Sequence, residues 1–589
     1  MFDPPSNLVS GEFIELYNRG DSVVDLTGWR LTRGVDFVIP ATTQLAPGGY
    51  LVIAADAQGL MAAHDISGVL GNYKGQLSNN GELIRLEDAW GNLVDEVDYK
   101  VGGEWPESPN GGGSSLELTH PLADNGFGTA WQASDESEKS SWQSFTFKDR
   151  FRQSRTFGGT TDYKEIYFHL VNDGHVVLRN IEFVKAGSSA NLIENPERMS
   201  GNNRSANGWL AQGNHWQTDV DTNGWLHIIS DGRGDNRPNR VEVDVPGMNR
   251  NDVCEIRFEA KWVTGSPRLI FSTWDHSIAH NFLIPIPNNP GTPGKANGTR
   301  QDRPPAQLAS LNHQPAVPTS SDWVTIGVDM QSAEDLQYVR VYHRADNSNN
   351  TGSWQFETMF DNGSSGGDEQ ADDGRYTARL GAHRNNGRIV QFYVEARTTS
   401  GETVQLPRWG REKPALYVVD DRQHRGDLRK MRVVVSAYDL GAISSGETSK
   451  YDYDFPRLAN HYFNATFISN EKDIFYNAGI RHSGSPWTRG NNLNRGKLKL
   501  QKDKPFRGKV KHRWDDDASN SGRRHHNRIT RYMLYLLGHP VNENEFVHVI
   551  INNQSPQLRE DTEPVGNEFL DRNFENGADG ELYLSLIHI

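Results

Sequence analysis

Glycine, serine and basic residues alternate through the stretch NAGIRHSGSPWTRGNNLNRGKLKL, which contains four glycines, Gly479, Gly484, Gly490 and Gly496. Glycine lets backbone N–H groups approach an anion closely, because it carries no Cβ. Arg481, Ser485 and Arg489 add side-chain donors, and a guanidinium can bind phosphate with two parallel hydrogen bonds. The KLKL run alternates, so Lys497 and Lys499 share one face of a predicted strand. The pattern indicates a phosphate-binding loop between two strands; the alternative is an ordinary amphipathic strand with a solvated lysine face.

The charge around this stretch differs from that of the whole chain. Between Glu471 and Arg531 there are 16 Lys and Arg against 6 Asp and Glu, a balance of +10, whereas the formal charge of the chain is −15. A basic island in an acidic chain predicts a phosphate-bearing partner, although a solvated, loop-rich face would have the same composition. The overall acidity argues against nucleic acid as a partner.

Regular elements are predicted on both sides of the glycine-rich stretch. The segment DLRKMRVVVSAYDLGAI is typical of a strand followed by a helix or turn. Farther on, Ile529, Met533, Leu536 and Leu537 recur at helical spacing, and Gly538 is suited to a helix C-cap. The run EFVHVIIN then predicts a strand, and VGNEFLDRNF a short helical piece.

The first 135 residues predict an all-β sandwich. The runs GEFIELYN, GGYLVIA and GELIRLEDAWGNLVDEVDY have strand length and are bounded by turn residues. The segment EDAWGNLV predicts a hairpin turn with Gly91 and Asn92 at its tip.

Two further β modules are predicted downstream. Short strands over residues 150–293 favour a galactose-binding-like or jelly-roll sandwich, and those over 319–420 favour an Ig-like or fibronectin-III-like module. The polar segment 136–149 and the Pro/Gly-rich segment 294–318 are interpreted as linkers. The predicted fold is therefore mainly β and multidomain.

Aromatic and acidic clusters in these modules have two interpretations each. Tryptophan faces can stack on sugar rings, but tryptophan is more often buried in a core; the residues concerned are Trp209, Trp216, Trp225 and Trp274. Clustered carboxylates can bind Ca²⁺, but Asp and Gly are also ordinary turn residues; the residues concerned are Asp361, Asp368, Asp372 and Asp373. Core packing and turn formation are favoured, and no metal site is assigned.

Length and composition limit the class of protein. A chain of 589 residues corresponds to about four domains of ordinary size. The single cysteine, Cys254, excludes an internal disulfide framework, which fits a reducing compartment and also surface proteins that lack disulfides. No segment reaches the ~20 apolar residues that span a bilayer, and the N-terminus lacks the pattern of a signal peptide.

Two parts of the chain resemble known families. The ordered motifs GEFIELYNRGDSVVDLTGWRL, LAPGGYLVIA and LSNNGELIRLEDAWGNLVDEVDY over residues 1–135 resemble the lamin-tail domain of bacterial surface proteins. The motifs GIRHSGS, KLKL, LLGHP, VIINN, EFLDRNF and DGELY over residues 421–583 resemble the N-terminal part of the spore-coat protein H (CotH) kinase family. This second resemblance implies an incomplete, kinase-like α+β domain.

The CotH resemblance also implies cofactors and site residues. It implies ATP and Mg²⁺ as cofactors, Lys499 as a contact to the nucleotide phosphates, and Glu563 as its ion-pair partner or as a neighbour of the metal. Arg481, Ser485 and Arg489 join them as nucleotide-binding residues. The alternatives are a surface lysine and a solvated glutamate in the acidic loop REDTEP. The sequence departs from the family pattern at Asn552–Asn553 and at Gln557–Arg559, and the family's catalytic and Mg²⁺-binding aspartates are expected beyond residue 583.

Both ends of the chain are expected to be cut. Met1 matches an internal methionine of the lamin-tail pattern, and native sequence is expected to stop at Tyr583. Residues 584–589, LSLIHI, match one reading frame of a sequencing adapter. The sequence therefore predicts a fragment that binds nucleotide weakly and is not active alone.

Two functions are consistent with these patterns. The first is a secreted or cell-surface bacterial kinase of the CotH type, which transfers the γ-phosphoryl group of ATP to protein hydroxyls and attaches through its β modules to a surface or glycan. The second is a non-catalytic adhesin that binds surface polysaccharide and carries a degenerate kinase-like domain. The phosphoacceptor is expected to be a protein in the first case.

Overall fold

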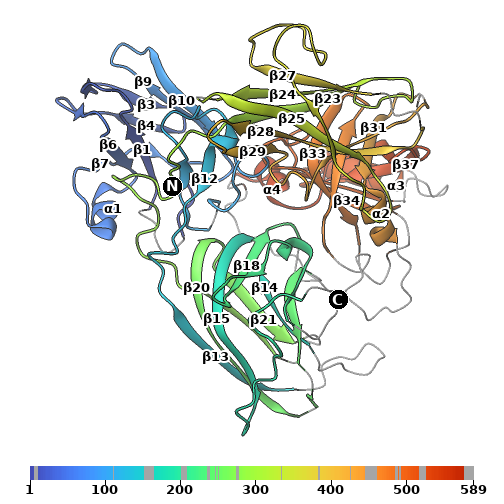
Figure 1. Cartoon of the computed structure of the whole chain (residues 1–589), viewed down its shortest axis with the longest axis horizontal. Helices are drawn as coiled ribbons and strands as arrows, with labels where there is room; N and C mark the ends of the chain where they lie inside the picture. The colour runs from blue at the N-terminus through green and yellow to red at the C-terminus, as the bar shows by residue number, and fades with distance from the viewer. Residues whose placement is uncertain are drawn as a thin grey trace.

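A computed structural model shows a mainly β chain whose strands form several sheets and one closed barrel (Figure 1). The structure describes residues 1–5, 11–110, 112–151, 165–200, 208–234, 239–245, 247–249, 251–273, 278–332, 334–381, 385–422, 424, 426–444, 460–484, 489, 493–515, 525–575 and 577. Within these residues, no helix combines the length and the apolar character needed to cross a bilayer.

The first domain packs a three-stranded sheet, β1-β6-β7, and a five-stranded sheet, β10-β9-β3-β4-β8, around a core that includes Leu31, Ile53 and Leu86. The predicted hairpin is confirmed: β9 and β10 are antiparallel, and Asp88 accepts the backbone N–H groups of Trp90 and Asn92 in the turn, each at 2.9 Å. Its elements are β1 (Phe13–Tyr17), β2 (Val24–Asp25), β3 (Arg30–Thr32), β4 (Val35–Val38), β5 (Gln44–Leu45), β6 (Tyr50–Ala54), α1 (Ala57–His64), β7 (Leu70–Gly71), β8 (Lys74–Gly75), β9 (Glu82–Glu87), β10 (Leu93–Tyr99), β11 (Leu116–Leu118), the 3₁₀ turn η1 (Gly128–Ala130) and β12 (Trp131–Ala133).

The second domain consists of two five-stranded sheets, β13-β20-β15-β18-β17 and β16-β19-β14-β21-β22. Strand β20 shows why the two sheets pack together. Its apolar residues Ile256, Phe258 and Trp262 are buried, and the polar residues between them point to the other face of the sheet. Its elements are β13 (Gln143–Arg150), β14 (Glu165–Leu170), β15 (Asp173–Lys185), β16 (Leu210–Gln212), η2 (Gly213–His215), β17 (Asp219–Val220), β18 (Leu226–Asp231), β19 (Arg240–Asp244), β20 (Val253–Gly265), β21 (Arg268–Thr273) and β22 (Ala279–Leu283).

The third domain packs sheet β23-β24-β27 against sheet β26-β25-β28-β29, with β30 also paired to β28. Its core includes Val328, Val341 and Phe392. The strands are β23 (Gln307–Gln314), β24 (Val324–Gln331), β25 (Leu336–Ala345), β26 (Gln355–Thr358), β27 (Arg375–Leu380), β28 (Ile389–Thr398), β29 (Thr403–Leu406) and β30 (Ala415–Val418).

Strands occupy parts of both segments that were predicted to be linkers. β13 begins in 136–149, ends at Arg150 and pairs with β20, and β23 lies in 294–318 and pairs with β24. In β13 the apolar residues Phe145 and Phe147 alternate with polar ones, so the strand is half-buried and its composition remains polar. Both segments therefore contain paired strands although their composition is typical of linkers.

The C-terminal part forms a closed barrel in the order β31-β32-β33-β34-β35-β37-β36. Only the β31–β36 contact is parallel. The interior contains Val433, Ile480, Leu498 and Trp514, all fully buried. Its elements are β31 (Arg429–Val435), α2 (Ala437–Ser444), β32 (Phe463–Ser469), β33 (Asp473–His482), β34 (Gly496–Lys499), β35 (Lys511–Asp515), α3 (His526–Leu536), β36 (Asn544–Ile551), β37 (Gln557–Thr562) and α4 (Asn567–Asn573).

Helices α2, α3 and α4 and strand β36 occur where the sequence predicts them. Gly538 ends α3 with φ +78°, and its N–H donates to the carbonyl oxygen of Tyr535 at 2.9 Å. None of the residues of α3 is buried, so its apolar residues lie on the surface of the described chain.

Candidate functional site

Five basic residues lie on the outer face of three neighbouring barrel strands. Pairing places Arg481 of β33 opposite Lys497 of β34, and Lys497 opposite Arg513 of β35. Lys499 and Lys511 form the next cross-strand pair. These five residues are called the basic face below. The alternate residues Ile480, Leu498 and His512 are buried on the other side, so the strand period separates charge from core.

Arg481 is held over an aromatic ring. Its guanidinium carbon lies 4.9 Å from the centroid of the Tyr462 ring, a cation–π distance. Its Nε is buried and has no hydrogen-bond partner in the described part of the chain. Arg481 therefore retains an unused donor on the basic face.

The predicted loop between β33 and β34 is described only in part. Arg489 donates from Nε to the carbonyl oxygen of Gly484 at 3.1 Å and from Nη2 to Oδ1 of Asn460 at 2.6 Å. These contacts join Arg489 to Gly484, which follows β33, and to Asn460, which precedes β32. Ser485, a predicted phosphate donor, and Gly490 lie outside the described residues.

Two of the predicted phosphate-loop glycines have a packing role. A Cβ at Gly479 would lie 2.8 Å from the side chain of Tyr462, and a Cβ at Gly496 would collide with the ring of Trp514. Glycine is required at these positions because an aromatic side chain occupies the space. The interpretation of Gly479 and Gly496 as anion-approach positions is therefore corrected.

Lys499 lies where the barrel meets the second domain. Its Nζ donates to the carbonyl oxygen of Gly232 at 3.4 Å. Burial lowers the pKa of Lys499, the carboxylate of Glu107 opposes that shift, and the charge of Arg233 adds to it. The Lys499 side chain is therefore a largely desolvated cation at a domain junction.

The predicted ion pair between Lys499 and Glu563 is not formed. Glu563 pairs with Arg572 through both carboxylate oxygens, with Nη1 to Oε1 at 2.5 Å, and it also accepts the N–H of Glu543 at 3.1 Å. The difference follows from barrel closure: β37 carries the REDTEP segment into the wall of the barrel, and Glu563 is buried. The interpretation of this segment as an acidic solvent loop is also wrong.

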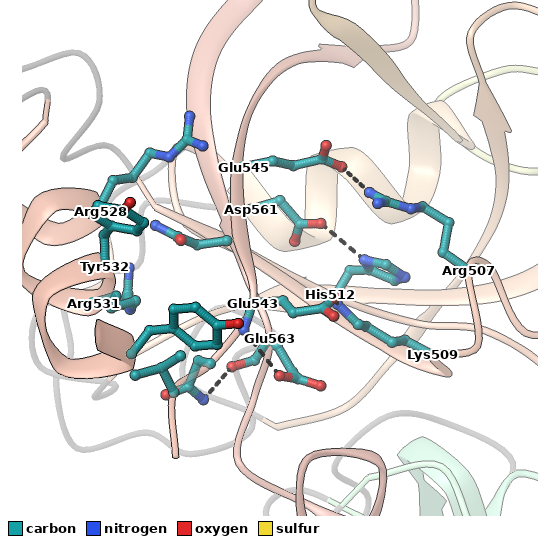
Figure 2. A pocket seen from close by; sticks show the side chains of 14 residues that line it. Arg507, Lys509, His512, Arg528, Arg531, Tyr532, Glu543, Glu545, Asp561 and Glu563 are labelled. Atoms are coloured by element: carbon teal, nitrogen blue, oxygen red, sulfur yellow. Dashed lines mark hydrogen bonds and ion pairs between the residues drawn. The ribbon is translucent and has the colours of Figure 1, made fainter. Parts of the chain in front are cut away.

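Glu563 lines a polar pocket at one end of the barrel (Figure 2). The pocket has a volume of about 420 Å³ and lies between α3 and strands β35, β36 and β37. Arg507 pairs with Glu545 at 2.7 Å, and Lys509 pairs with Glu543. Sequence reasoning missed these residues, although the alternating run NENE, residues 542–545, gave a local signal.

The acidic cluster in the third domain combines both predicted interpretations. Carboxylate oxygens of Asp361, Asp368 and Asp373 lie within 4.8 Å of one another, a spacing compatible with a cation. Asp361 also accepts the backbone N–H groups of Asp373 at 3.1 Å and of Gly374 at 3.0 Å, which is turn chemistry. The hydrogen bonds account for the cluster without an ion.

The tryptophans of the second domain divide between core and surface. Trp209 is fully buried and donates to the carbonyl oxygen of Pro196 at 2.9 Å, as expected for a core residue. Trp225 is half-buried and packs edge-on against Trp142 at 5.1 Å between ring centroids. The guanidinium of Arg179 lies 4.1 Å from the centroid of the Trp142 ring. Trp274 lies outside the described residues.

Comparisons with known proteins identify only the N-terminal part. Residues 1–101 match the family model of the Lamin Tail Domain. No curated protein matches the chain.

Two solved structures of alpha-2-macroglobulin from E. coli are similar over long stretches. The native conformation shares 11% identity over 69% of this chain and 19% of its own, with a TM-score of 0.15. The trypsin-activated form shares 10% identity over 83% of this chain and 28% of its own, with a TM-score of 0.17. At these scores the likeness carries no argument about fold or function.

The two packed sheets of the first domain agree with the family match to residues 1–101, because both indicate an Ig-like sandwich. The chain therefore carries an Ig-like lamin tail domain at the N-terminus of a mainly β, multidomain protein.

Proposed function

We propose that this chain is the nucleotide-binding part of a cell-surface protein kinase of the CotH type, whose β modules attach it to a surface or glycan. The kinase would transfer the γ-phosphoryl group of ATP to a protein hydroxyl. The observation that carries this proposal is the basic face on β33, β34 and β35, beside the glycine-rich loop.

The basic face suits a triphosphate for an electrostatic reason. Like charges directly opposite one another on neighbouring strands repel and destabilise a sheet. Lys499 and Lys511 form such a pair. A bound polyanion would remove that repulsion, and an arginine could contribute two parallel hydrogen bonds to one phosphate. The unused Nε of Arg481 supports this use.

Mg²⁺ fits the basic face less well. Among the described residues, the one carboxylate trio with cation-compatible spacing belongs to the third domain. The basic face therefore supplies phosphate contacts and no carboxylate set for a metal. The proposed role of this chain is nucleotide binding, and no metal-dependent step is assigned to its described residues.

Titration with a fluorescent ATP analogue tests the proposal. The expected result is saturable binding that weakens about 10-fold or more in Arg481→Ala and in Lys499→Ala, because a hydrogen bond to a charged group contributes about 1.5–3 kcal/mol. Lys472→Ala is the matched control, since Lys472 lies exposed in the turn between β32 and β33. Unchanged binding in both variants would contradict the proposal.

A non-catalytic adhesin is the second candidate. The half-buried pair Trp142 and Trp225, with Arg179 against it, offers flat aromatic surface and a donor on one sheet of the second domain. Retention of the whole chain on an insoluble polysaccharide, lost in Trp225→Ala and accompanied by no ATP binding, would favour this function. Both candidates place the protein outside the cell.

A further inference from the structure

The pocket at the barrel end is separate from the basic face. Its wall includes inward-facing residues of the barrel strands, such as His512, whereas the basic face is formed by the outward-facing alternate residues, such as Lys511 and Arg513. Tyr532 and Tyr535 of α3 line its other side. A pocket of about 420 Å³ lies within the size range of small-molecule sites, which often occupy the mouths of β-barrels.

The charges around the pocket cancel. Four Arg and Lys residues and four carboxylates line it. Glu545 also pairs with Arg429 at 3.1 Å, and Arg531 pairs with Glu560 at 2.8 Å. An anion entering here would meet as many carboxylates as cations. The pocket therefore disfavours a triphosphate and favours a ligand with no net charge.

A buried polar pair lies at the pocket wall. His512 and Asp561 are 3% and 8% exposed, and Nδ1 of His512 donates to Oδ2 of Asp561 at 3.0 Å (Figure 2). Within the described chain, Nε2 of His512 and Oδ1 of Asp561 have no hydrogen-bond partner. A buried polar atom without a partner is costly, so these atoms suit a ligand that brings hydroxyl groups.

Aromatic rings and further polar groups complete the lining. Tyr532 and Tyr535 are 62% and 64% exposed, although each offers a flat apolar ring and a hydroxyl group. Arg528 lies against the ring of Phe546 with 4.9 Å between its guanidinium carbon and the ring centroid. Rings beside alternating donors and acceptors match a pyranose, which has an apolar face and a rim of hydroxyl groups.

We propose that the barrel-end pocket binds a neutral sugar. The tyrosines of α3 stack on the apolar face of the ring, and His512, Asp561 and the paired charged residues bind its hydroxyl groups. This site is additional to the proposed nucleotide site, and neither requires the other.

Saturation-transfer NMR on the whole chain tests this site, with glucose, galactose, mannose and N-acetylglucosamine as probes. At least one sugar is expected to bind saturably at millimolar concentration. The double variant Tyr532→Ala/Tyr535→Ala is expected to weaken that binding about 5-fold or more, because it removes both aromatic rings that stack on the sugar. Met533→Ala is the matched control, because Met533 lies on the same helix, is 58% exposed and does not line the pocket.

Each outcome decides the proposal. Binding that is lost in the tyrosine variant, kept in Met533→Ala and unaffected by ATP supports it. Absence of binding for all four sugars overturns it, as does an equal loss in Met533→Ala. An ATP titration of the tyrosine variant separates the two sites. Lost ATP binding in this variant would place the nucleotide in the pocket and overturn the sugar assignment. Sugar binding by a chain that does not bind ATP would contradict the nucleotide site alone and support the sugar site.

Discussion

Arg432 connects the barrel to the third domain through one buried guanidinium. It pairs with Asp420 at 3.1 Å and with Glu471 at 3.0 Å, and its side chain is 1% exposed. Burial alone would raise the pKa of Asp420, but Arg422 and Arg432 outweigh it and lower that pKa. The arginine thus keeps a buried carboxylate ionised at the domain boundary.

Removing this guanidinium is expected to be costly. Arg432→Met leaves Asp420 buried with one cation fewer. Removing one partner of a buried ion pair lowers the free energy of unfolding by about 3–5 kcal/mol. The control is Arg422→Met, which removes a partly exposed partner of the same carboxylate and is expected to cost about 1 kcal/mol or less. The urea dependence of hydrogen exchange in β31 measures both. Equal losses in the two variants would contradict the account.

At the residue scale, the sequence predicted which face of a strand a side chain occupies, because the two-residue period of a strand alone decides this. Lys497 and Lys499 share the outer face, while Leu498 and Leu500 are buried, as the alternation predicts. The partner of Glu563 could not be predicted in this way. It depends on which strands close the barrel and on Arg572 of α4, a contact set by tertiary structure.

At the element scale, Gly496 allows β34 to pass the largest side chain of the barrel core. An added Cβ would overlap the ring of Trp514, which is fully buried and donates from Nε1 to the carbonyl oxygen of Leu493 at 3.0 Å. Neither the ring nor the strand can move away without losing these contacts. The position therefore requires glycine for packing.

Gly496→Ala is expected to destabilise the barrel by about 1–3 kcal/mol, the usual cost of overpacking a core. Gly441→Ala is the control, because an added Cβ there meets no atom within 4 Å. Its helical position predicts a gain of up to about 1 kcal/mol. Urea midpoints followed by hydrogen exchange of β34 measure both changes. A neutral Gly496→Ala would contradict the described packing.

The sequence predicted helix α3 and the alternating strands, but it did not predict the strands that lie in the segments interpreted as linkers. The spacing of Ile529, Met533 and Leu536 identified α3, because a helical period is visible in any context. β13 and β23 were missed because half-buried strands next to Ser- or Pro-rich segments have the composition of linkers. Closure of seven strands into a barrel is a long-range property that no local pattern contains.

At the scale of the whole molecule, the first domain contacts the barrel through two residues with carboxyl groups desolvated by burial, Glu104 and Asp503. The N–H of Glu104 donates to Oδ2 of Asp503 at 2.9 Å. Burial, and then the nearby Asp503, raise the pKa of Glu104 to about 7, and burial raises the pKa of Asp503 to about 6. Burial at this junction therefore favours the protonated carboxyl groups, whereas the hydrogen bond from Glu104 itself favours ionised Asp503.

This contact is expected to weaken as the pH rises. Because both folded pKa values exceed the unfolded ones, the folded state binds more protons between about pH 4 and 7, and its stability falls across that window. The double variant Glu104→Gln/Asp503→Asn is expected to lose this part of the pH dependence. Melting temperatures from pH 4.5 to 8 measure it for both proteins. If the melting temperatures of the two proteins changed in parallel with pH, Glu104 and Asp503 would not be the cause of this pH dependence.

Composition alone predicted a β-rich chain of several domains, because many short alternating runs and turn residues are visible locally. The interdomain contacts were not predictable from it. Arg233 donates to the carbonyl oxygen of Asn477 at 2.9 Å, and Lys499 lies against Gly232, but these pairs are more than 200 residues apart in the chain. Such contacts set the surroundings of the proposed nucleotide site.

Hydrogen exchange of the whole chain with and without ATP tests the central claim most directly. The account predicts that saturating ATP slows exchange in peptides from β33, β34 and β35, which carry the basic face, and leaves β36 and β37 unchanged. Protection concentrated in β36 and β37, or no protection anywhere at an ATP concentration that saturates binding, would contradict it.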